Sequence, residues 1–141
     1  AWRHCTQAER IIEMNNNTPG IVTGYEDYLD SRDMQERLDF LSGFNDEELS
    51  EKEKEEYNEL YRLRKELIDD YGEESWNWGY SFIRDDFFPD YAQEFAEDIG
   101  AIDKKQYWLT CHIDWEGVAR DMQMDYWEVE LFGNTYWTRE P

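Results

Sequence analysis

Apolar residues in the first half of the chain recur with the period of an α-helix. A Thr-x-x-Glu capping box predicts a short helix over residues 6–14. A second helix is expected to begin near Asp30 or Ser31 and to end at Gly43, because glycine is favoured just after the last helical turn. Its buried face is predicted to contain Met34, Leu38 and Leu41.

The longest predicted helix follows in the acidic segment after residue 45. Ser50 and Glu53 form a second capping-box pattern, and Gly72 supplies the end of the helix. Six apolar or aromatic residues recur at helical spacing and predict one buried stripe. They are Tyr57, Leu60, Tyr61, Leu67, Ile68 and Tyr71.

Two further helices are predicted in the second half of the chain. They follow an aromatic-rich segment at 75–91, which suits either packing between helices and a sheet or a subunit contact. One helix covers 90–99, and the other covers about 115–123 with Asp114 as its N-cap. The predicted buried residues are Tyr91, Ala92, Phe95, Ala96 and Ile99 in the first, and Trp115, Val118, Ala119 and Met122 in the second.

The chain closes in a predicted β-hairpin. Residues 127–131 alternate between apolar and acidic side chains, Gly133-Asn134 fits the turn, and 135–138 forms the returning strand. The expected fold class is therefore α+β, with an elongated shape. An acidic, mainly helical region at 1–74 precedes a C-terminal α+β region at 75–141, which contains a small helix and the hairpin.

Composition limits the class of protein and of partner. At 141 residues the chain can form one compact domain or two small lobes. Its 40% hydrophobic and 17% aromatic content argues against disorder. The net charge of -21 comes from 35 acidic and 14 basic residues. This imbalance argues against direct binding to nucleic acid or to an anionic membrane and favours a basic partner.

Cysteine usage and hydropathy bear on the compartment. Cys5 and Cys111 lie far apart without metal-ligand spacing, and two free thiols in a reducing cytosol are favoured over one long-range disulfide. No apolar run approaches the roughly 20 residues that span a bilayer, and the first residues hold no apolar signal core. A cytoplasmic protein is expected.

Acidic residues are concentrated rather than spread evenly. Residues 26–74 hold 19 acids and 7 bases, a net of -12. A solvated face is the simplest explanation for one acidic helix, but the acids continue across later helices, and an ordinary surface mixes both signs. Such rows can stand in for DNA phosphates in a basic groove. At about 100° per residue, the face opposite the buried stripe of the long helix is predicted to carry Glu48, Glu51, Glu55, Glu59, Glu66 and Asp70, interrupted by Lys52 and Arg62. The later carboxylates are Glu73, Glu74, Asp85, Asp86, Asp90, Glu94 and Glu97.

Catalytic and metal-binding patterns are weak. No segment has the ligand spacing and central glycine of an EF-hand loop, and Cys111 and His112 lack enough partners for zinc. Pro89-Asp90 with residues 103–105 fits the loose pattern of metal-dependent nucleases. However, Asp90 opens a predicted helix, and so acidic a nuclease would repel DNA. We therefore expect no catalysis, no metal and no cofactor.

The C-terminal third contains a pattern typical of a known family. The segments DYAQEFAEDIGAI (90–102) and HIDWEGVARDMQMDYWEVELFGNTYW (112–137) include Ile113-Asp114-Trp115, then Ala119-Arg120-Asp121, then a tyrosine-bearing hairpin. Over residues 90–138, about a third of the chain, the sequence resembles the ArdA family of antirestriction proteins, which mobile elements and phages use to protect incoming DNA. The first two thirds match that family in being acidic and helical.

The resemblance implies an elongated, dimeric and noncatalytic DNA mimic. Its implied partner is the DNA-binding groove of type I restriction-modification enzymes in a host bacterial cell. From the residues themselves, Asp114 is interpreted as a cap and Trp115 as core. Arg120 is expected to pair with a nearby acid such as Asp121 or Asp125, with an interface role left open.

Two alternatives stay open. Any deep basic groove would satisfy the same physics, so a CRISPR effector or another defence nuclease is the next candidate target. An acidic adaptor, a protein of a different class, would instead bind through its aromatic patch. Gln123, Met124 and the hairpin edge are candidates for a homodimer seam. The C-terminal aromatic residues, most of which are expected to be core, are Trp108, Trp115, Trp127, Tyr136 and Trp137.

Overall fold

The computed structural model describes residues 19–141, so the helix predicted over 6–14 and Cys5 lie outside the described residues. The boundaries predicted for the helix before Gly43, the helix between Ser50 and Gly72, and the helix after Asp114 are confirmed. In chain order the elements are β1 (Tyr28–Asp30), α2 (Ser31–Ser42), α3 (Glu51–Tyr71), α4 (Glu73–Trp78), β2 (Ser81–Arg84), η1 (Asp85–Phe87), α5 (Phe88–Asp98), η2 (Lys104–Gln106), α6 (Tyr107–Thr110), α7 (Trp115–Gln123), β3 (Trp127–Leu131) and β4 (Asn134–Thr138).

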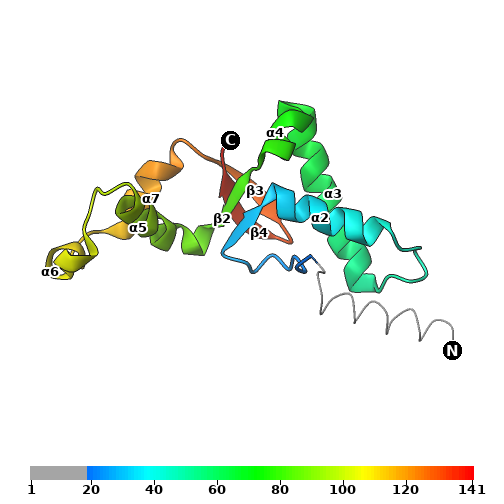
Figure 1. The fold of residues 1–141 in the computed structure, drawn as a ribbon, viewed down its shortest axis with the longest axis horizontal. Helices are drawn as coiled ribbons and strands as arrows, with labels where there is room; N and C mark the ends of the chain where they lie inside the picture. The colour runs from blue at the N-terminus through cyan, green and yellow to red at the C-terminus, as the bar shows by residue number, and fades with distance from the viewer. Residues whose placement is uncertain (1–18) are drawn as a thin grey trace.

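A four-stranded antiparallel sheet lies at the centre of the molecule, with helices on either side, which confirms the predicted α+β class (Figure 1). The strand order is β1-β2-β4-β3. Ile83 of β2 lies opposite Tyr28 on one side and Trp137 on the other. Because successive side chains of a strand point to opposite faces, Phe82 and Ile83 enter two different cores.

The larger core lies between the sheet and helices α2, α3 and α4. Asp30 caps α2 by accepting the Arg32 N–H at 2.8 Å, and Ser50 and Glu53 form the predicted capping box of α3. Leu41 is buried, as predicted for α2. The other buried residues on this side include Leu29, Met34, Leu38, Leu60, Leu63, Leu67, Trp76, Tyr80, Phe82, Val129, Leu131 and Tyr136.

A smaller core joins the sheet to α5 and α7. Phe88 makes edge-to-face contacts with Tyr91, Tyr126 and Trp137. The aromatic segment at 75–91 therefore packs between helices and a sheet, one of the two roles predicted for it. The buried residues are Ile83, Phe88, Ala92 and Ala119, with Phe87, Tyr91, Trp115, Val118, Met122, Tyr126 and Trp137 partly buried around them.

The molecule is elongated, with its two helical groups at opposite ends of the long axis (Figure 1). Helices α2 and α3 lie at one end, the sheet lies in the middle, and α5 and α7 lead to α6 at the other end. The regions 1–74 and 75–141 both contribute to the larger core, for example through Leu60 and Tyr136. Neither region encloses this core alone.

The buried side of α3 differs from the predicted stripe. Leu60, Leu63 and Leu67 are buried, whereas Tyr61 and Tyr71 are exposed. At about 100° per residue, the observed buried side is rotated by about 70° from the predicted one. The tyrosines misled the prediction, because an amphipathic ring at the rim of a core has the same helical spacing as a ring inside it.

A buried ion pair, which was not predicted, lies between α2 and α3. The Arg37 guanidinium donates to the two carboxylate oxygens of Glu56 at 2.8 and 2.9 Å, and both side chains are buried. Glu56 also accepts the Val22 N–H at 2.9 Å, and Arg37 donates to the Pro19 carbonyl at 3.3 Å. The pair therefore ties the segment before β1 to both helices.

The predicted boundaries and inward face of α5 need correction. The helix begins at Phe88, before the predicted start at Asp90, because Pro89 is well suited to a first helical turn. Phe95 and Ile99, predicted to face inward, are exposed. The helix runs away from the sheet, and its main packing partners are α7, η1 and β2 (Figure 1).

The hairpin is confirmed, but its turn lies one residue earlier than predicted. Phe132 and Gly133 have positive φ values of 53° and 78°, as the two central residues of a type I′ turn require. Asn134 therefore pairs with Leu131 as the first residue of β4. Its side-chain amide donates to the Gly24 carbonyl at 2.7 Å, which fixes the turn against the preceding loop.

Candidate interaction surface

Four of the carboxylates predicted to face away from the buried stripe of α3 instead border its buried side, whereas Glu51 faces out as predicted. At about 100° per residue, Glu55, Glu59, Glu66 and Asp70 are centred about 80° from the buried leucines. The exposed side of α3 is mixed in charge. By the same helical geometry, its outermost line contains Glu51, Lys54, Asn58, Arg62, Lys65 and Asp69.

Glu59 holds the β3–β4 hairpin in place. Its carboxylate accepts the Phe132 N–H at 2.9 Å and a hydrogen bond from the Arg62 guanidinium. Arg62 also donates to the Glu130 carbonyl at 2.6 Å and to Glu66 at 3.0 Å. Glu59 is thus committed to a tertiary contact, and the charge of Glu66 is shared with an arginine.

The other predicted carboxylates at this end divide into two groups. Glu55, Asp70 and Glu74 are exposed, and their side chains make no hydrogen bond or ion pair with any of residues 19–141. Among the described residues, these three are therefore the predicted carboxylates of α3 and α4 that remain candidates for contact with a partner. The remaining three are held by neighbours: Glu48 by the Asn45 amide at 3.2 Å, Glu51 by Lys54 at 3.7 Å and Glu73 by Arg64 at 3.6 Å.

A second group of carboxylates follows η1 and α5, and we name it the α5 row: Asp86, Asp90, Glu94 and Asp98. All four are exposed and have no side-chain partner within the described part of the chain. The members within α5 are four residues apart, about 6 Å along the helix axis. Asp98 is absent from the carboxylates predicted to bind a partner, although it follows Glu94 by four residues, as Glu94 follows Asp90.

The α5 row has no basic neighbour in the sequence, because no lysine or arginine occurs between Arg84 and Lys104. The other two carboxylates predicted in this stretch are engaged. Asp85 accepts the Trp137 indole N–H at 2.8 Å, and Glu97 lies 3.3 Å from the Lys104 ammonium. Within residues 85–98, the carboxylates without a side-chain partner among the described residues are therefore those of the row.

The family-like pattern forms the start of α7. Asp114 caps the helix by accepting the Gly117 N–H at 3.2 Å, as predicted. Trp115 packs against the smaller core, and Ala119 is buried within it, while Ile113 is half-buried. These residues place α7 against α5 and the sheet.

Arg120 and Asp121 are exposed on α7. Arg120 pairs with Asp114 at 3.9 Å, so the predicted pairing with a nearby acid is confirmed, but the acid is neither Asp121 nor Asp125, the two examples considered. Helical side chains tilt toward the N-terminus, so an arginine at this position reaches back to the cap more readily than forward.

Large apolar side chains are exposed at the far end of the molecule, on α6 (Figure 1). Tyr107 and Trp108 are each 71% exposed and Leu109 is 53% exposed. The expectation that most C-terminal aromatics are core is confirmed, and Trp108 is the exception among the five. Met124, a candidate for the homodimer seam, is also exposed, while Gln123 is half-buried.

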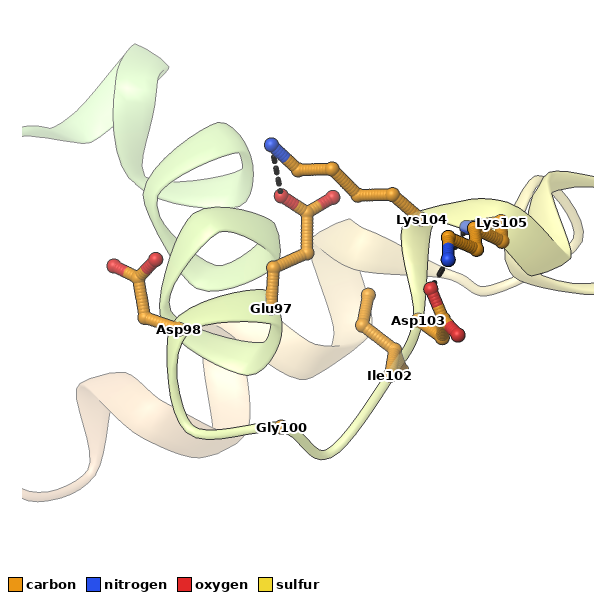
Figure 2. Close-up of a pocket in the computed structure, with 7 residues that line it drawn as sticks. All are labelled: Glu97, Asp98, Gly100, Ile102, Asp103, Lys104 and Lys105. Atoms are coloured by element: carbon orange, nitrogen blue, oxygen red, sulfur yellow. Dashed lines mark hydrogen bonds and ion pairs between the residues drawn. The ribbon is translucent and has the colours of Figure 1, made fainter.

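An open hollow of about 580 Å³ lies at the turn between α5 and η2. Figure 2 shows the residues that line it. Lys104 reaches across it to Glu97, and Asp103 accepts the Lys105 backbone N–H at 2.9 Å, so these contacts shape the turn. Within residues 19–141, no three His, Cys, Asp or Glu side chains are grouped to hold a metal ion. Cys111 is a free, exposed thiol.

The resolved pKa shifts in the described residues all move away from neutral pH. Burial raises the pKa of Tyr91 to about 12. Burial also raises the pKa of Tyr136, whose hydroxyl donates to the Glu26 carbonyl at 2.7 Å. The hydrogen bond from Arg32 lowers the pKa of Asp30. None of these shifted groups is poised to exchange a proton near neutral pH.

Comparison with known proteins gave no relative: no protein-family model, curated protein or solved structure matches the chain. The resemblance to the ArdA family therefore stays a prediction. Among the helices formed by residues 19–141, none has the length and apolar character needed to cross a membrane.

Proposed function

We propose that the protein is a noncatalytic inhibitor that occupies the DNA-binding groove of a host defence enzyme by imitating the charge of DNA. The α5 row is the observation that carries this proposal. Its four carboxylates are exposed, lack a basic neighbour in sequence and lack a side-chain partner among the described residues. Such an arrangement costs folding free energy through self-repulsion, but it creates a field that a basic groove neutralises.

The α5 row needs additional charges to imitate a duplex. Duplex DNA carries one negative charge per roughly 1.7 Å of its axis, whereas residues four apart on a helix supply one per roughly 6 Å. Glu55, Asp70 and Glu74, on α3 and α4, provide further available carboxylates. The proposed surface therefore combines both ends of the elongated molecule, and a homodimer would lengthen it.

Type I restriction-modification enzymes are the first proposed target, because the pattern around Asp114 and Arg120 resembles the ArdA family. A CRISPR effector or another defence nuclease with a deep basic groove comes next, since the same charge complementarity applies. The inhibitor would act in the cytoplasm of the host bacterial cell, without a cofactor.

Binding to a purified type I methyltransferase core, with duplex DNA as competitor, tests this function. We expect mutual exclusion between the protein and DNA. We also expect the affinity to fall at least about tenfold between about 50 and about 200 mM salt. Binding releases ions from both surfaces, and this release contributes less free energy as the salt concentration rises. Simultaneous binding of DNA and protein, or no binding at low salt, would contradict the proposal for this target.

An acidic adaptor that binds through aromatic residues is the second candidate, favoured by the exposure of Tyr107 and Trp108. Aromatic anchoring predicts an affinity that changes little with salt. The same titration therefore separates the two functions: a flat salt response together with unimpeded DNA binding supports the adaptor.

A further inference from the structure

Residues Tyr107, Trp108 and Leu109, which we name the α6 tip, expose three large apolar side chains in succession. Thr110, the next residue, is buried. The short helix therefore buries a threonine and exposes the rings of Tyr107 and Trp108. Ile99, at the end of α5, is also 62% exposed. Clustered apolar exposure of this kind is typical of a contact surface.

The charge around the α6 tip differs from that of the rest of the chain. Residues 99–112 hold one acid, Asp103, and two bases, Lys104 and Lys105, a net of +1 in a chain of net charge -21. Lys104 is paired with Glu97 across the hollow in Figure 2. The acidic surface therefore ends at this turn, and an apolar surface begins.

The α6 tip lies at the same end of the molecule as the α5 row, beyond the last residue of α5 (Figure 1). The α5 row runs along η1 and α5, and the chain passes from the end of α5 through η2 directly into α6 (Figure 1). A protein that covers Asp90, Glu94 and Asp98 therefore comes close to the tip. Complementary charge attracts that protein to the row. The uncharged side chains of the tip form no ionic contact with it.

Charge also distinguishes between the molecules that could contact the tip. A second copy that docked at the tip would bring two acidic α5 rows towards each other, and an anionic membrane would meet the same carboxylates, so repulsion opposes both at this site. A basic protein is attracted by the same charge. The partner that best matches the charge around the tip is therefore the protein already attracted by the α5 row.

We propose that the α6 tip inserts into an apolar pocket at the edge of the basic groove of the same target protein. This inference rests on the proposed function and adds an anchor that salt does not weaken. Tryptophan and tyrosine are enriched among the residues that carry most of the binding energy of interfaces, whereas exposed ionic contacts are screened. The tip thereby fixes the position at which the acidic surface enters the groove.

Trp108→Ala tests this anchor, with Trp78→Ala as a matched control. Trp78 is 76% exposed on α4, away from α6, so both substitutions remove a solvent-exposed tryptophan without opening a core. The dissociation constant for the methyltransferase core is measured for wild type and both variants at about 50 and about 200 mM salt. Light scattering reports the mass of each free protein.

We expect Trp108→Ala to weaken binding at least about tenfold at both salt concentrations, with an unchanged salt slope, and Trp78→Ala to match wild type. Binding of Trp108→Ala equal to wild type would overturn the anchor and leave the proposed function standing. Absence of wild-type binding would overturn both. A wild-type dimer that Trp108→Ala converts to a monomer would also overturn the anchor, because a second copy would then cover the tip.

Discussion

The α2–α3 end and the α5–α7 end of the molecule are both acidic, but their carboxylates have different roles. At the α2–α3 end, Glu56 and Glu59 accept backbone N–H groups and arginine donors. At the α5–α7 end, Asp86, Asp90 and Glu94 face solvent without a partner among residues 19–141. The comparison teaches that the net charge of a sequence overstates the charge that a partner can use.

Removing Glu56 should have the largest effect on stability, because it leaves the buried Arg37 guanidinium unpaired. We expect Glu56→Ala to lower the free energy of unfolding by about 3–5 kcal/mol. Urea denaturation followed by circular dichroism measures this change. The adjacent Glu55→Ala removes an exposed carboxylate and should stay within about 0.5 kcal/mol of wild type. Equal effects of the two substitutions would remove the distinction between structural and available carboxylates.

Glu59→Ala should have a smaller effect, because it leaves the Phe132 N–H and one Arg62 contact unsatisfied at a partly exposed site. The expected loss is about 1–3 kcal/mol in the free energy of unfolding. Glu66→Ala is the control, since Glu66 contacts the same arginine but no backbone N–H, and it should cost less than about 0.5 kcal/mol. A Glu59→Ala variant as stable as Glu66→Ala would contradict the role of Glu59 in holding the hairpin.

Asp30 offers a pH-dependent test of the α2–α3 end. Its pKa is lowered by the hydrogen bond from Arg32, so its charge contributes stability above the unfolded pKa of about 3.9, and this contribution is lost as pH falls through the lower folded pKa. Asparagine also caps helices, so Asp30→Asn should cost at most about 1 kcal/mol at neutral pH. The gap between variant and wild type in urea denaturation should shrink at about pH 3. A gap in the free energy of unfolding that widens at about pH 3 would contradict the lowered pKa of Asp30 in the folded protein.

Local sequence patterns were sufficient for much of the fold. Capping residues such as Asp30, Ser50 and Asp114 act within a few residues of themselves, and helical spacing is also local, so α2, α3 and α7 were predicted. The short elements α4 and β2 were not predicted, because six and four residues give too little periodicity to identify.

The roles of individual carboxylates were beyond sequence reasoning, because their partners are distant in the chain. Glu56 meets Arg37 across 19 positions, and Glu59 meets Phe132 across 73. Nothing in the spacing of glutamates on α3 separates these two from Glu55, which has no partner among the described residues. The α5 row was more predictable, since the absence of nearby lysine and arginine is visible in the sequence itself.

Neutralising the α5 row should have the smallest effect on stability. Asp86→Asn, Asp90→Asn and Glu94→Gln together remove three exposed charges that repel one another and have no internal partner among the described residues. Relief of repulsion is opposed by the lost interaction of Asp90 with the start of α5. We expect the free energy of unfolding to stay within about 1 kcal/mol of wild type, measured by urea denaturation. A larger loss would show that the row is structural.

The affinity of this triple variant for the methyltransferase core tests the central claim most directly. The control is Glu51→Gln, Glu66→Gln and Glu73→Gln, which removes the same charge from carboxylates that pair with Lys54, Arg62 and Arg64. We predict that the α5 variant binds at least about tenfold more weakly with a shallower salt slope, while the control stays close to wild type. Equal affinities for the two variants would contradict the claim that unpaired carboxylates, rather than net charge, form the binding surface.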